Sequence, residues 1–186
     1  MITVLEAAMA IKSTIFKAEL QITDMDRNYY NDHALTIARH PSENDERMML
    51  RILTFAINAS ASLSFTKGLS TEDEPDLWQK SLSDEIQLWI DLGQPDEKRI
   101  RRACGRSDRV IIYTYNHNSA EAWWDKMQNK LQRFSNLSIF SIDDALISAM
   151  AQFSQRTMQL QFTIQDGVTL ISDGEHSLEI SFKQTK

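Results

Sequence analysis

The sequence predicts a mixed α/β protein: a mixed β-sheet core with flanking helices, preceded by a β-hairpin and followed by a three-strand antiparallel meander. Three observations predict this class. Apolar and polar residues alternate near both ends of the chain, as in 157–164, which is typical of strands with one buried face. Two near-continuous apolar runs, 86–92 and 109–115, are typical of strands covered on both faces. Segments with a period of 3.6 residues lie between the strands and predict the helices.

The bulk composition predicts one globular domain. The 186 residues are 42% hydrophobic, which suffices for a sizeable core, and three prolines with five glycines leave no room for a disordered linker. We assign residues 1–8 to an N-terminal extension and 9–186 to the domain. One cysteine, Cys104, excludes an intrachain disulfide and a thiolate zinc site, which fits a cytoplasmic setting. No apolar run approaches the roughly 20 residues that span a bilayer.

The N-terminal half is expected to begin with a hairpin and continue into a helix. Residues 11–23 and 29–39 alternate as two strands around a turn at 24–28. Pro41 ends the second strand, and Ser42 with Asp45 resembles a capping box that starts a helix over 43–59.

One acid of this helix lies on its apolar stripe. Glu46 falls on the face formed by Met49, Leu50 and Leu53. It is either a functional carboxylate turned towards the core, or a first-turn acid that faces water and favours the helix dipole. The residues leave both alternatives open.

The middle of the chain places acids around a buried strand. A short strand at 62–66 precedes an acidic segment, and Asp91 stands near the end of the strand 86–92. Gly93 ends that strand, and Pro95 is expected to be the first residue of an amphipathic helix over 95–104. Acids that converge at the end of a buried strand, with a lysine close behind, are typical of a divalent-metal site. The plain alternative is a set of solvated acids.

The C-terminal half continues the α/β pattern and ends in strands. A strand at 109–115, a helix from Asn118 or Ser119 to about Phe134, a strand at 136–142 and a short helix from Asp143-Asp144 follow in order. The meander consists of 157–164, 168–172 and 177–182, joined at the hairpin turns Asp166-Gly167 and Asp173-Gly174.

Several stretches of the chain resemble the YaeQ family of bacterial proteins. The most specific are HPSENDERMMLR at 40–51 and LWIDLGQPDEKRI at 88–100, and the likeness extends from Met9 to about Phe182. The resemblance implies a fold related to the PD-(D/E)XK, restriction-endonuclease-like superfamily, with a variant of its metal-binding signature.

The resemblance also implies a set of site residues. Glu46 would be the helix acid, Asp76 of Pro75-Asp76 the first strand acid, and Asp91 the second. The motif lysine two residues after the second acid is absent, because that position is Gly93, and Lys98 is the nearest replacement. The letters of Asp96-Glu97-Lys98 also match the motif, but on a helix the first and third residues point about 200° apart. We therefore prefer Asp91 with a displaced Lys98.

The implied activity is that of a nuclease-like phosphodiesterase that depends on Mg²⁺ or Mn²⁺. Asp76, Asp91 and Glu46 would hold the metal, Lys98 and Glu46 would act in catalysis, and Arg99 and Arg102 would bind the nucleic-acid backbone.

Two other functions compete with this activity. The first is a catalytically inactive protein of the same fold that binds nucleic acid or a protein partner, with a role connected with transcription. Gly93 and the net charge of −6 favour it. The second is an interaction protein whose exposed meander edge recruits a partner strand.

Other chemistry-bearing residues give weaker signals. The four histidines, His33, His40, His117 and His176, lack metal-ligand spacing and are expected to be surface residues or hydrogen-bonded polar residues. Cys104 is expected in the core. The tryptophans could stack on bases, but Trp123 and Trp124 stand at helical spacing with Met127, which favours packing in the core.

Overall fold

The computed structural model describes residues 13–67, 71 and 73–186, so the predicted extension at 1–8 lies outside it. The mixed α/β class is confirmed, with two sheets and four α-helices within these residues. In chain order the elements are β1 (Thr14–Asp24), β2 (Tyr29–Arg39), α1 (Asp45–Asn58), β3 (Leu63–Phe65), β4 (Leu77–Lys80), β5 (Ile86–Leu92), α2 (Glu97–Arg106), β6 (Ser107–Thr114), α3 (His117–Leu131), β7 (Leu137–Ser141), α4 (Asp144–Met150), a 3₁₀ turn (Ala151–Phe153), β8 (Thr157–Gln165), β9 (Val168–Ser172), β10 (Ser177–Ser181) and β11 (Lys183–Gln184).

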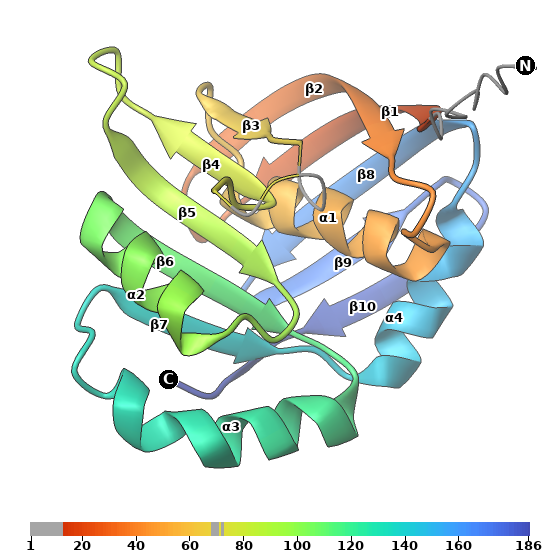
Figure 1. The fold of residues 1–186 in the computed structure, drawn as a ribbon. Helices are drawn as coiled ribbons and strands as arrows, with labels where there is room; N and C mark the ends of the chain where they lie inside the picture. The colour runs from red at the N-terminus through yellow and green to blue at the C-terminus, as the bar shows by residue number, and fades with distance from the viewer. Residues whose placement is uncertain (1–12, 68–70, 72) are drawn as a thin grey trace, which may run out of the picture.

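The two ends of the chain form one five-stranded sheet, in the order β10-β9-β8-β1-β2. The predicted hairpin and meander are both confirmed, since β1 pairs antiparallel with β2, and β9 pairs antiparallel with β8 and β10. The sequence did not predict that β1 and β8 pair in parallel, with Ile22 opposite Phe162. This long-range pairing joins the two β units along one face, as Figure 1 shows.

The middle of the chain forms a six-stranded sheet, in the order β11-β7-β6-β5-β4-β3. The strands β5, β6 and β7 run parallel, so their carboxyl ends meet at one edge. The sequence analysis missed β4, which lies inside the acidic segment, and β11, which has two residues. Both strands are too short for alternation to reveal them.

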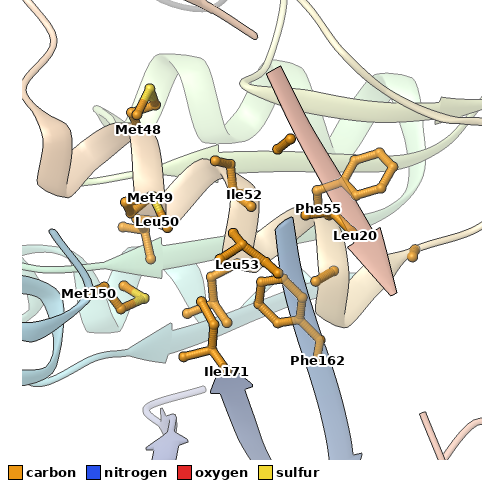
Figure 2. Close-up of a cluster of buried hydrophobic side chains, with 14 of the residues drawn as sticks. Leu20, Met48, Met49, Leu50, Ile52, Leu53, Phe55, Met150, Phe162 and Ile171 are labelled. Carbon is orange, nitrogen blue, oxygen red and sulfur yellow. The ribbon is translucent and has the colours of Figure 1, made fainter. Parts of the chain in front are cut away.

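Helix α1 lies between the two sheets and is buried on nearly all sides (Figures 1 and 2). The predicted apolar face is correct for Met49, Leu50 and Leu53. Met48, Ile52 and Phe55 are also buried, so the helix has no wide solvent face. A helix that is apolar on all sides belongs inside a core. Helices α2 and α3 pack instead on the opposite face of the six-stranded sheet, against a second apolar cluster around Trp89.

Two predicted helix starts were wrong, and side-chain caps explain both. Helix α1 begins at Asp45, because the Asn44 side chain accepts a hydrogen bond from the Arg47 N–H, whereas Ser42 bonds to His40. Helix α2 begins at Glu97, because Asp96 is an extended N-cap whose side chain accepts from the Arg99 N–H. Asp and Asn are preferred at this position because their oxygens satisfy an exposed helix N–H.

No helix in the described part of the chain has the length and apolarity to cross a membrane.

Replacement of Leu53 by alanine is expected to destabilise the protein by about 3 kcal/mol, because the cavity would open inside the core between the sheets. The side chain of Leu53 is fully buried and lies near Phe162 and Ile171 in Figure 2. Urea unfolding measures the loss. Leu82→Ala is the matched control, since Leu82 is fully exposed and should change the free energy of unfolding by less than about 0.5 kcal/mol. Equal effects of the two changes would contradict the buried position of α1.

Candidate functional site

The two strand acids, Asp76 and Asp91, lie together because β4 and β5 are antiparallel. Asp76 directly precedes β4, and Asp91 stands one residue before the end of β5. Leu77 pairs with Ile90, so the start of β4 lies beside the end of β5. The Asp76 N–H donates to the Ile90 carbonyl at 2.9 Å, and the Leu92 N–H donates to Asp76 Oδ2 at 2.8 Å. Both carboxylates are therefore held at the same end of the six-stranded sheet.

Asp91 is bound by the guanidinium group of Arg99. Arg99 Nη2 lies 2.7 Å from Asp91 Oδ1, and Arg99 Nε lies 3.0 Å from Asp91 Oδ2. The Trp89 indole N–H donates to Asp91 Oδ2 at 2.9 Å. Arg99 Nη2 also donates to the Glu74 carbonyl at 2.8 Å. Bidentate pairing of this kind is the strongest ordinary carboxylate interaction, because two charge-assisted hydrogen bonds share one geometry.

Asp76 is bound by Arg47 of α1, which connects it to a further ion pair. Arg47 Nη2 lies 2.6 Å from Asp76 Oδ1, and Arg47 Nη1 lies 2.9 Å from Glu43 Oε1. The other Glu43 oxygen accepts from Arg51 Nη1 at 2.7 Å. We call these six residues, Glu43, Arg47, Arg51, Asp76, Asp91 and Arg99, the carboxylate–arginine cluster.

The cluster is buried and balanced in charge, with three carboxylates against three guanidinium groups. Asp76 is 5% exposed and Asp91 is 2% exposed. Burial raises the pKa of Asp91 above its ordinary value, and the nearby Asp76 charge adds to this, while Arg99 and Trp89 oppose it. Burial would lower the pKa of Arg47, but the charge and the hydrogen bond of Asp76, together with Tyr115 and Glu43, raise that pKa above its ordinary value.

Tyr115 extends the cluster towards the next strand. It follows β6, and its side chain hydrogen-bonds to Arg47. Burial raises the pKa of the Tyr115 hydroxyl above its ordinary value, so the phenol is protonated at neutral pH. A neutral phenol beside Arg47 leaves the charge balance of the cluster unchanged.

The helix acid Glu46 is directed towards α4. Glu46 Oε1 accepts from the Ser148 hydroxyl at 2.7 Å, and Oε2 accepts from Asn44 at 3.5 Å. Glu46 is thus held by α4, whereas Asp76 and Asp91 are held by Arg47 and Arg99. The buried acid on this side of the cluster is Glu43, whose side chain is fully buried and which precedes the helix. The predicted place of Glu46 on the apolar face of α1 is therefore explained by its contact with the neighbouring helix α4.

Gly93 is required by the backbone at the end of β5. Its φ is +99°, a conformation that side-chain-bearing residues rarely adopt, and a Cβ would lie 3.7 Å from Tyr115 Cε1. The strand geometry that places residues 91 and 93 on one side ends at Leu92. Lys98 lies in the first turn of α2 with an exposed side chain, and its neighbour Arg99 is the α2 residue that reaches Asp91.

The two arginines predicted to bind a nucleic-acid backbone are both in ion pairs. Arg99 pairs with Asp91, and Arg102 pairs with Asp73. The side chain of Arg99 is 25% exposed and that of Arg102 is 32% exposed, so both stay partly accessible to solvent.

These residues, as arranged, do not fit a Mg²⁺ ion. Magnesium prefers several free oxygen ligands and a surplus of negative charge. Here Asp91 accepts hydrogen bonds on both oxygens, Asp76 does the same, and guanidinium groups already balance their charges. Across residues 13–67, 71 and 73–186, no three His, Cys, Asp or Glu side chains are grouped closely enough to hold a metal ion.

The family of the chain is decided by its match to a family model. Residues 9–182 match the model described as YaeQ protein. This chain belongs to the YaeQ family. An uncharacterised YaeQ protein of Salmonella typhi is 48% identical over 172 residues, which is 92% of this chain and 95% of that one. The uncharacterised YaeQ protein of Escherichia coli strain K12 is 47% identical over 173 residues, covering 93% and 96%.

Crystal structures of the YaeQ family agree with the fold. The YaeQ protein of Xanthomonas axonopodis pv. citri superposes with a TM-score of 0.90 at 43% identity, covering 94% of this chain and 98% of that one. The YaeQ protein of Pseudomonas syringae gives a TM-score of 0.89 at 34% identity, covering 94% and 96%. These likenesses give the family and the fold.

The sequence analysis missed half of the carboxylate–arginine cluster, namely Glu43, Arg47 and Arg51. Their spacing of four residues was a usable signal, because residues at i and i+4 of a helix lie side by side. The pairing of this row with Asp76, 29 residues beyond Arg47, has no local signature.

Replacement of Arg99 by methionine is expected to destabilise the protein by about 3 kcal/mol at neutral pH, because it leaves Asp91 buried and charged without its partner. The double variant Asp91→Asn/Arg99→Met should recover most of the loss, since it removes both charges. Urea unfolding of the wild type, both single variants and the double variant gives the coupling free energy. Additive effects would contradict a coupled pair.

The loss in Arg99→Met should depend on pH. Without Arg99 the pKa of Asp91 in the folded state rises further above its ordinary value of 3.8, so the folded state favours the protonated carboxyl. The deficit relative to wild type is then full above the folded pKa and shrinks as the pH falls towards 3.8. Unfolding curves at about pH 7 and about pH 4.5 measure this change. A deficit that grows on acidification would contradict the assignment.

Proposed function

We propose that this chain binds nucleic acid through the exposed basic face of α2 and does not cleave it. The absence of cleavage is proposed because Asp76 and Asp91 are each paired with an arginine. In a metal-dependent phosphodiesterase these carboxylates would be open to a cation. Here the protein's own guanidinium groups take that position.

The observation that supports binding is a concentration of positive charge in a chain with a net charge of −6. Helix α2 presents Lys98, Arg101 and Arg106 as exposed side chains, beside the partly exposed Arg102. Its exposed acid, Asp96, caps the helix, while Glu97 is paired with Lys130 and Arg133 of the neighbouring α3 region. Phosphates are bound by such local basic faces, and the affinity falls as salt replaces the released counterions.

A metal-dependent nuclease is the second candidate, favoured by the closeness of Asp76 and Asp91. The charge of Asp76 contributes to the raised pKa of Asp91, as in many catalytic pairs. This function would require Arg47 and Arg99 to release both carboxylates.

Fluorescence anisotropy with labelled single-stranded and double-stranded DNA and RNA tests the binding. Arg101→Gln/Arg106→Gln should weaken binding to all probes and lower the salt slope by about 2, one unit for each lost phosphate contact. Lys17→Gln/Lys67→Gln is the matched control, because it removes the same charge from exposed positions elsewhere. An equal loss of affinity in both variants would show that binding depends on the net charge alone, and it would overturn the proposal.

Two metal assays separate the two candidates. Calorimetric titration with Mg²⁺ or Mn²⁺ is expected to show no saturable binding to the wild type, and the labelled probes should remain intact in Mg²⁺. Cleavage that is lost in Asp91→Asn would overturn the proposal and support the nuclease.

A further inference from the structure

A second candidate site lies at the carboxyl ends of β6 and β7. A hollow of about 840 Å³ opens there between α3 on one side and α4 with the C-terminal segment on the other. Its volume is within the range of small-molecule sites, and ligands of α/β sheets bind beyond the carboxyl ends of the strands. Tyr115 lines the hollow and also contacts Arg47 of the carboxylate–arginine cluster. The hollow is therefore adjacent to that cluster but separate from it.

Four aromatic residues line this hollow: Tyr115, Trp123, Trp124 and Phe182. Their surroundings hold them in place. The Trp123 indole N–H donates to the Pro95 carbonyl at 2.8 Å, and the Trp123 and Trp124 ring centroids are 6.4 Å apart. Phe182 packs on Tyr113 with a centroid distance of 5.0 Å. Because these rings are already held in place, a ligand can bind to their π-faces without the entropy cost of ordering them.

The charged residues around the hollow favour a cation. Glu121 and Asp143 contribute two exposed carboxylates, and Lys183 contributes one ammonium group. His117 Nε2 lies 3.3 Å from a carboxylate oxygen of Glu121. Two carboxylates and one ammonium group leave the lining with a net formal charge of −1 from these three residues. Such a rim repels phosphate, so the hollow does not continue the basic face of α2.

We propose that this hollow binds a small organic cation, an alkylated ammonium with an apolar body. Aromatic faces attract such cations through their quadrupoles, and the attraction is strongest where the cation is partly desolvated. The carboxylates of Glu121 and Asp143 add Coulomb attraction at the mouth. This inference stands independently of nucleic-acid binding by α2.

The test compares a cation with its uncharged isostere. Choline and 3,3-dimethylbutan-1-ol have nearly the same shape, so any difference in affinity reports the charge. Calorimetry and indole N–H spectra should show choline binding about tenfold tighter. The Trp123 and Trp124 signals should shift, whereas Trp78, which is covered by Lys80, and the fully buried Trp89 act as internal references.

Two surface variants with opposite charge changes sharpen the test. Glu121→Gln should weaken choline binding about threefold to tenfold, and Lys183→Gln should strengthen it by a similar factor. Both leave the fold intact, because both side chains are exposed. Trp124→Leu should abolish the preference for the cation while it keeps an apolar wall.

Four outcomes would overturn the proposal, and the first three concern measurements of choline binding. They are equal affinity for choline and its isostere, shifts confined to tryptophans outside the hollow, and an unchanged affinity in both charge variants. Absence of saturable binding of choline and of the larger benzyltrimethylammonium at millimolar concentrations would also overturn it. Loss of nucleic-acid binding in the α2 variants has no bearing on these results, so the two proposals fail separately.

Discussion

The structure depends on the burial of one helix between two sheets. Helix α1 contributes side chains such as Met48, Leu50 and Phe55 to a core that receives apolar residues from both sheets. The helix thus acts as the common layer, and its burial provides the hydrophobic term that holds the sheets together. It also fixes the positions of Arg47 and Arg51, which both bind Glu43, and it places Arg47 beside Asp76 at the start of β4.

A carboxylate at such a buried position needs a partner. The desolvation of Asp91 would be costly, and the protein offsets it with the Arg99 guanidinium group and the Trp89 indole N–H. The same solution is repeated at Asp76 with Arg47. An internal guanidinium group satisfies a carboxylate as completely as a bound cation does, but it carries no water to activate. At both acids the partner is therefore an arginine of the chain itself.

The surface around this cluster is divided by charge. The α2 face next to Arg99 is basic, whereas the hollow beyond Tyr115 has a carboxylate-rich, aromatic lining. Tyr115 and Gln94 connect the two regions, because Gln94 donates to the Tyr115 carbonyl and Tyr115 contacts Arg47. In a chain with a net charge of −6, local segregation of charge thus places a basic surface beside an acidic one.

The sequence by itself determined the class of the fold, most helices and strands, and the family. Alternation and helical periodicity are local properties, so they were sufficient for the hairpin, the meander and the parallel strands. The tertiary structure decided the rest. The β1–β8 pairing, the burial of α1 on all sides and the partners of Asp76 and Asp91 join residues that are far apart in sequence. Lys98 and Arg99 are adjacent in the sequence. Because α2 begins at Glu97, Arg99 reaches Asp91, whereas Lys98 is exposed to solvent.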